Sequence, residues 1–167
     1  MPDFEIMVTS LLERVAAALT ERNWRLATAE SCTGGWIAKC CTDMVGSSEW
    51  FDRGYIAYSY RAKEQMLGIS HDLLVKYGAV SESIASQMAR GAKERSKVAV
   101  TVSATGIAGP AGGMDGKPVG LVHFGWCIDT DPVSCDAAVF EGDRESVRQQ
   151  TVIHALEGIL LRMNSSA

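Results

Sequence analysis

Apolar side chains recur at every third or fourth position near both ends of the chain. In residues 4–19 they stand at Phe4, Val8, Leu11, Leu12, Val15 and Leu19. Near the other end the apolar stripe consists of Val152, Ala155, Leu156, Ile159, Leu160 and Met163. This spacing places the apolar side chains on one face of an α-helix. We therefore expect a helix at each end, the second capped by Asp143.

Shorter patterns alternate between these two helices. Apolar, β-branched and aromatic runs predict strands at residues 24–29, 50–60, 98–103, 119–128 and 133–140. Helical spacing predicts helices at residues 34–43, 63–67, 72–76 and 82–95, with Ser81 as the cap of the last one. The connection at residues 129–132 is short, which favours an antiparallel hairpin between the last two strands.

The alternation of helices and strands indicates an α/β protein. No repeat, linker or low-complexity segment interrupts the 167 residues, and this length suits one domain with one substantial core. We expect a single layered α/β/α domain over residues 1–167, with a mixed sheet of about five strands and flanking helices.

Composition and charge narrow the classes of partner. The net charge is −4 and no cluster of Lys and Arg could follow a phosphate backbone, so nucleic acid is not an expected partner. No apolar run approaches the ~20 residues that span a bilayer, and the first residues lack the features of a signal peptide. We expect a cytoplasmic protein that does not bind membranes. Its five cysteines and three histidines show no spacing typical of disulfides or metal ligands, and no metal or cofactor is expected.

A serine stands where the first predicted strand gives way to a helix. The block Glu-Ser-Cys-Thr-Gly-Gly occupies residues 30–35. Ser31 at such a turn faces backbone N–H groups that can stabilise an oxyanion, so one segment could supply both nucleophile and oxyanion hole. The alternative is that Ser31 or Thr33 merely caps the helix and the glycines allow close packing.

A serine nucleophile needs a base, and none of the histidines stands in a suitable context. Lys63 is predicted in the first turn of a helix, where the macrodipole disfavours its charged form and burial would lower its pKa further. Tyr58, at the end of the preceding strand, could relay a proton or orient the base. The alternative is that Lys63 is an ordinary surface charge.

Two further segments could bind an anionic substrate. Residues 106–118 hold five glycines and two prolines and follow the most strand-like run in the chain, so their N–H groups could surround a phosphate or carboxylate. Arg144, just before the last helix, could bind the same group with its planar guanidinium. The alternatives are a plain flexible loop and an ordinary surface arginine.

Taken together, these segments resemble the CinA C-terminal domain family. The resemblance extends from about Leu11 to Leu160, and its most specific parts are residues 30–35 and the block Gly-Ile-Ala-Gly-Pro at residues 106–110. The resemblance implies hydrolysis of nicotinamide mononucleotide to nicotinate mononucleotide and ammonia, with Ser31 as nucleophile assisted by Lys63 and Tyr58. It also implies that Thr105, Gly106, Gly109 and Arg144 contact the substrate.

The hypothesis therefore assigns a role to each part of the site. The N–H groups around Cys32, Thr33 and Gly34 are expected to hold the oxyanion, and the only expected partner besides a second copy of the chain is a small-molecule nucleotide substrate. A homodimer is the oligomeric state we expect. Two alternatives remain open: a nucleotide-binding or regulatory module without catalysis, linked to competence or DNA damage, and an amidohydrolase of another small amide.

Overall fold

A five-stranded mixed sheet forms the centre of the molecule. The computed structural model describes residues 3–165, and its strand order is β2-β1-β3-β4-β5. Strands β2 (Phe51–Ile56), β1 (Leu26–Glu30) and β3 (Val100–Gly106) pair in parallel. Strands β4 (Leu121–Ile128) and β5 (Ser134–Val139) complete the sheet as an antiparallel hairpin beside β3. The predicted fold class and hairpin are confirmed.

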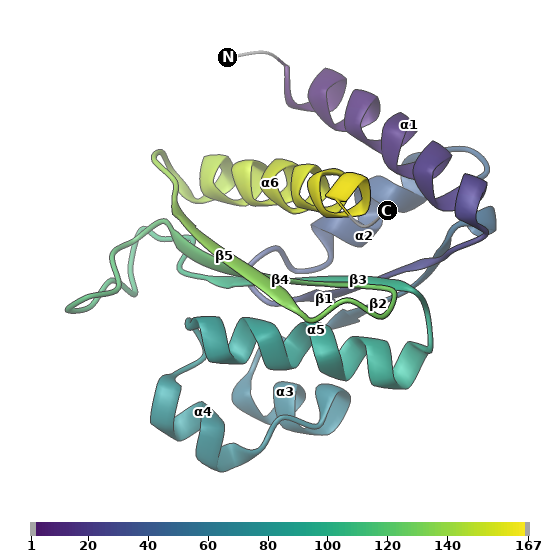
Figure 1. The fold of residues 1–167 in the computed structure, drawn as a ribbon. Helices are drawn as coiled ribbons and strands as arrows, with labels where there is room; N and C mark the ends of the chain where they lie inside the picture. The colour runs from purple at the N-terminus through teal and green to yellow at the C-terminus, as the bar shows by residue number, and fades with distance from the viewer. Residues whose placement is uncertain (1–2, 166–167) are drawn as a thin grey trace.

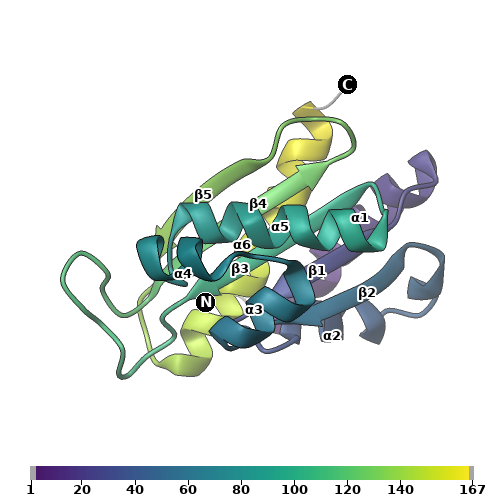
Figure 2. The same ribbon diagram turned by 90° about the horizontal axis from the view of Figure 1, so that it is seen from below.

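Helices cover both faces of this sheet (Figure 1). One face carries α1 (Phe4–Arg22), α2 (Trp36–Asp43) and α6 (Arg144–Ser165). The other face carries α3 (Tyr60–Leu67), α4 (His71–Tyr77) and α5 (Glu82–Ser96), with α5 lying across the middle of the sheet (Figure 2). A short 3₁₀ helix, Ser47–Glu49, precedes β2. The result is the layered α/β/α arrangement that the sequence predicts.

The central strands are buried because helices pack on both of their faces. All five residues of β1 are buried, as are the first six of β3. The face toward α5 carries small polar side chains: Thr101 and Ser103 donate from their hydroxyls to the carbonyls of Ala89 and Ala85 in that helix. Their hydrogen bonds satisfy polar groups that would otherwise be costly to bury.

Two helix starts differ from the sequence expectation for identifiable reasons. Helix α2 begins at Trp36 and not at residue 34, because Gly34 and Gly35 have φ of 61° and 96° and form a turn. Helix α3 begins at Tyr60, three residues before the predicted start, because the Ser59 hydroxyl caps it by accepting from the N–H of Ala62. The predicted caps Ser81 and Asp143 are confirmed by hydrogen bonds from Ile84 N–H and Ser146 N–H.

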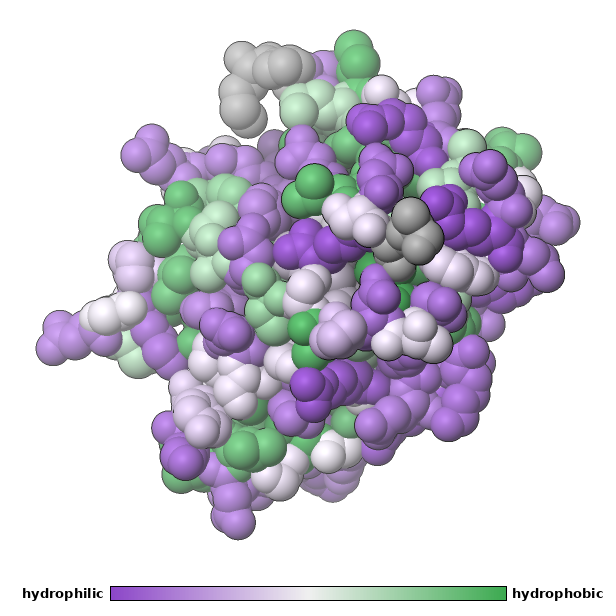
Figure 3. Space-filling model, in the orientation of Figure 1, coloured by the Kyte–Doolittle hydropathy of each residue, from purple (hydrophilic) through white to green (hydrophobic). Residues whose placement is uncertain are grey.

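Polar residues cover most of the surface on the face shown in Figure 3, and apolar residues appear there in small groups. Within residues 3–165, no helix is both long enough and apolar enough to cross a membrane.

Candidate active site

Ser31 lies at the carboxyl end of the central parallel strands. It directly follows β1, and its N–H donates to the carbonyl of Ala104 in β3 at 3.0 Å. The residue is 8% exposed, so its hydroxyl is held by the protein and open on one side. Ligands of α/β proteins gather at this edge of the sheet.

Lys63 contacts Ser31 at this edge of the sheet and belongs to α3, which covers the face opposite α2 (Figure 1). It occupies the first turn of α3 and is fully buried. Its Nζ lies 2.9 Å from Ser31 Oγ, and it also donates to the carbonyls of Ala57 at 2.9 Å and Tyr58 at 3.0 Å. The structure thus brings together two residues that are 32 positions apart and that the sequence singled out independently.

The surroundings of Lys63 suit a base. Burial lowers the pKa of Lys63 from 10.5 to about 8, and the nearby Cys32 thiol works weakly in the opposite direction. A neutral lysine has two N–H donors and one lone pair. With its two protons on the carbonyls of Ala57 and Tyr58, the lone pair faces the Ser31 hydroxyl, so this geometry can accept the serine proton.

Cys32, next to Ser31, is a poor nucleophile in this setting. Burial raises the pKa of the Cys32 thiol to about 12, so its reactive thiolate is scarce at neutral pH. Of the two neighbouring side chains, only Ser31 touches a base.

Glu30 has a structural role that the sequence alone did not indicate. Its carboxylate is buried and accepts from the hydroxyls of Thr28 and Thr33 and from the N–H groups of Ile37 and Ala38, at 2.7 to 2.9 Å. It therefore caps α2 in place of Ser31 or Thr33. A carboxylate just before a helix is favoured by the helix dipole, and this was the available signal.

Of the backbone N–H groups that follow Ser31, one already donates a hydrogen bond within the turn and two do not. Gly34 N–H donates to the Ser31 carbonyl at 3.0 Å, which makes it unavailable to an oxyanion. Within residues 3–165, the N–H groups of Cys32 and Thr33 donate to no other residue. The turn therefore uses the Gly34 N–H itself, and of the two free N–H groups only that of Cys32 belongs to a residue of the cavity wall within residues 3–165.

A cavity of about 270 Å³ opens beside Ser31 and Lys63. Its wall includes the predicted residues Cys32, Tyr58, Thr105, Gly106, Gly109 and Arg144. Thr33 and Gly34 do not line it, since the Thr33 side chain is fully buried against Glu30. The loop after β3 and the start of α6 thus reach the serine, as the sequence predicted.

Tyr58 contributes through its backbone to the Ser31–Lys63 pair. Its carbonyl accepts from Lys63, whereas its phenol accepts from Arg144 Nη2 at 3.3 Å and the residue as a whole is 60% exposed. Arg144 Nη1 also donates to the carbonyl of Gly109 at 2.8 Å. Both residues line the cavity, and within residues 3–165 the hydrogen bond of the phenol is with Arg144 and not with Lys63.

The histidines stand apart from Ser31. His71 contacts Glu64 and His154 contacts Asp136, and none of the three lines the cavity. Among the described residues, no three His, Cys, Asp or Glu side chains form a group suited to a metal ion.

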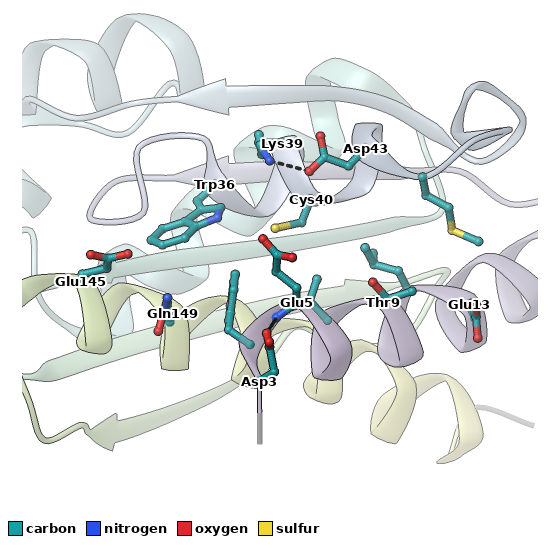
Figure 4. A pocket seen from close by; sticks show the side chains of 14 residues that line it. Asp3, Glu5, Thr9, Glu13, Trp36, Lys39, Cys40, Asp43, Glu145 and Gln149 are labelled. Carbon is teal, nitrogen blue, oxygen red and sulfur yellow. Dashed lines mark hydrogen bonds and ion pairs between the residues drawn. The ribbon is translucent and has the colours of Figure 1, made fainter. Parts of the chain in front are cut away.

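A second cavity, of about 750 Å³, lies between α1 and α2 near the start of α6 (Figure 4). Acidic side chains surround it, among them Glu5 and Glu145, while Lys39 pairs with Asp43 at 2.6 Å. It contains no serine–base pair. Its volume is larger, but the arrangement able to attack a carbonyl lies in the smaller cavity.

Fold and site define a class: an α/β/α domain with a serine–lysine pair at the carboxyl edge of parallel strands. The chain belongs to the CinA C-terminal domain family, whose sequence profile matches residues 8–163.

Individual relatives resemble the chain over nearly its whole length. The nicotinamide-nucleotide amidohydrolase PncC of Escherichia coli (strain K12) is 45% identical over 157 residues, 94% of each chain. PncC of Pseudomonas putida is 44% identical over 153 residues, 92% of this chain and 95% of that one. The crystal structure of competence/damage inducible protein CihA from Agrobacterium tumefaciens matches with a TM-score of 0.90 and 41% identity, covering 95% of this chain and 96% of the other.

Proposed function

We propose that this chain hydrolyses the carboxamide of nicotinamide mononucleotide to nicotinate mononucleotide and ammonia, with Ser31 as the nucleophile. The observation that carries the proposal is the 2.9 Å contact between Ser31 Oγ and the buried Nζ of Lys63. The substrate follows from similarity to relatives named nicotinamide-nucleotide amidohydrolases. A domain that only bound nucleotides would have no need of a lowered lysine pKa beside a serine.

The first half of the reaction forms an acyl-enzyme. Neutral Lys63 takes the Ser31 proton as Oγ bonds to the carboxamide carbon, and the carbonyl π electrons move onto oxygen. The N–H group of Cys32, a residue of the cavity wall, stabilises this oxyanion; such a donor contributes about 3 kcal/mol. The C–N bond then breaks, and Lys63 returns the proton to the departing nitrogen, which leaves as ammonia.

The second half regenerates the serine. Lys63 is neutral again once ammonia has its proton, and it deprotonates a water molecule that attacks the ester. Collapse of the second tetrahedral intermediate breaks the bond to Oγ, and the proton on Lys63 passes to Ser31. The products are nicotinate mononucleotide and free enzyme.

Substrate binding would use the remaining wall of the cavity. Arg144 offers a positive charge at the cavity wall, which also includes Gly106 at the end of β3 and Gly109 in the loop that follows. A phosphate is the anion that this combination suits, because guanidinium and backbone N–H groups both donate to its oxygens.

The direct test compares three nicotinamide compounds that differ in whether they carry ribose and phosphate. Wild-type protein is incubated with nicotinamide mononucleotide, nicotinamide riboside or nicotinamide, and ammonia and the acid product are measured together. The proposal predicts equal amounts of ammonia and nicotinate mononucleotide from the first, and kcat/KM at least 100-fold lower for the two compounds without phosphate. Binding of the mononucleotide without turnover would contradict it and favour a binding module.

A further inference from the structure

Arg148, on α6, reaches the turn that carries Ser31 from more than 100 residues away in the sequence. Its Nε donates to the carbonyl of Cys32 at 3.1 Å and its Nη2 to the carbonyl of Thr33 at 3.0 Å. The side chain is not part of the cavity wall. Its contacts are with the backbone of the turn and with the ring of Trp36.

We propose that Arg148 is a positioning residue that holds the oxyanion donor of the Ser31 turn, the Cys32 N–H, in place. The inference rests on the proposed function, because amide hydrolysis is the reaction in which an N–H group beside Ser31 acts as an oxyanion donor. It concerns the orientation of peptide units and not a contact between Arg148 and substrate.

The argument follows from the planarity of the peptide unit. The carbonyl and N–H of a trans peptide point in opposite directions, and the peptides of this turn are trans. By binding the Cys32 carbonyl, Arg148 fixes the peptide that follows Cys32. By binding the Thr33 carbonyl, it fixes the next peptide, whose Gly34 N–H donates to the Ser31 carbonyl. That bond in turn fixes the peptide bearing the Cys32 N–H.

The guanidinium is itself held by packing. Its central carbon lies 5.2 Å from the ring centre of Trp36 on α2, and Phe4 of α1 meets the same ring edge-on at 5.3 Å between centres. Figure 4 shows Trp36 on the wall of the larger cavity. A planar guanidinium can stack on a ring while donating in two directions, and a lysine ammonium cannot reproduce this geometry.

The test replaces Arg148 by Lys and by Ala, with Arg162→Lys and Arg162→Ala as matched controls. Arg162 lies on the same helix and also stacks on a tryptophan, Trp126, but hydrogen-bonds to Ser134. We expect kcat for nicotinamide mononucleotide to fall on the order of 100-fold in both Arg148 variants, the size of effect seen when an oxyanion donor is lost. KM should stay within twofold, and the midpoint of the pH profile should not move.

Two further readouts separate positioning from general stability. Methylguanidinium added to Arg148→Ala should restore at least part of kcat, and should do nothing for Arg162→Ala. Labelling of Ser31 by a fluorophosphonate, whose phosphoryl oxygen uses the same N–H donor, should slow at least tenfold in the Arg148 variants. Melting temperatures of all four variants identify any loss that comes from unfolding.

The outcomes distinguish this inference from the proposed function. A loss of kcat below tenfold in Arg148→Lys, with active wild type, would overturn the role of Arg148 alone. If wild type released no ammonia but reacted with the fluorophosphonate, the labelling rates would decide the role of Arg148 while the substrate proposal failed. Wild type inert in both assays would overturn both.

Discussion

The Lys63 amine controls when Ser31 can react, because only its neutral form has a lone pair. Burial lowers its pKa to about 8, so about a tenth of the amine is neutral at pH 7. Three oxygen atoms surround Nζ at 2.9 to 3.0 Å, and two of them are backbone carbonyls that cannot move independently. The arrangement serves both protonation states without a rearrangement of the site.

The activity should therefore rise with pH across the neutral range. Below the pKa the neutral fraction falls tenfold per pH unit, so kcat should fall about tenfold from pH 7 to pH 6 and level off above about pH 9. The measurement is ammonia release at saturating substrate, which removes the influence of the substrate phosphate on binding. A profile flat between pH 6 and pH 9 would contradict Lys63 as the base.

Glu30 should matter for stability. Replacing Glu30 by Gln puts an amide NH₂ where the carboxylate accepts four hydrogen bonds, leaving buried donors without an acceptor. We expect the free energy of unfolding to fall by about 3 kcal/mol, measured by urea denaturation. Glu13→Gln, at an exposed position of α1, is the control and should change it by less than about 0.5 kcal/mol. Equal stabilities for the two variants would refute the role of Glu30.

The residues that sequence could find are those whose chemistry shows locally. Ser31 stands at a strand-to-helix turn and Lys63 in a first helical turn, and both positions are readable from a few neighbours. The contact of Arg148 with Cys32 joins residues 116 positions apart. No local pattern marks such a contact, because it depends on how α6 crosses the sheet.

At the scale of elements, the start of α6 and the loop after β3 together form the substrate side of the site. Arg144 is the first residue of α6, and its guanidinium ties the loop carbonyl of Gly109 to the phenol of Tyr58. The sequence predicted that this loop and Arg144 would share a site. It did not predict that the Tyr58 phenol would face Arg144, because β2 ends at Ile56 and not at residue 60 as predicted, so Tyr58 lies in the connection to α3.

Arg144→Ala should weaken binding more than catalysis. Loss of one charged partner of a phosphate should raise KM for nicotinamide mononucleotide roughly 30-fold, corresponding to about 2 kcal/mol, with kcat changed less than threefold. KM for nicotinamide riboside should not change, because that compound lacks the phosphate. An equal rise for both compounds would show that Arg144 acts on something other than phosphate.

The whole molecule is built around one sheet with an apolar core on each face. One core lies under α1, α2 and α6, and the other under α3, α4 and α5. Layering and strand number were predictable because hydrophobic periodicity reports burial. The order β2-β1-β3-β4-β5 was not predicted, because pairing between distant parallel strands leaves no local signal. The homodimer stays a prediction.

Because both cores share the sheet, the domain should unfold as one unit. Circular dichroism of the helices and fluorescence of the four tryptophans should give coincident urea transitions. The tryptophans report on separate regions, from Trp24 after α1 to Trp126 in β4. Two separated transitions would contradict a single domain.

The measurement that tests the account most directly is ammonia release from nicotinamide mononucleotide at pH 8 by wild type and by Ser31→Ala. The account predicts turnover by wild type and a loss of at least 1,000-fold in the variant with an unchanged melting temperature, since the loss of a nucleophile removes the acyl-enzyme route. Near-normal turnover by Ser31→Ala would contradict the nucleophile and the mechanism built on it.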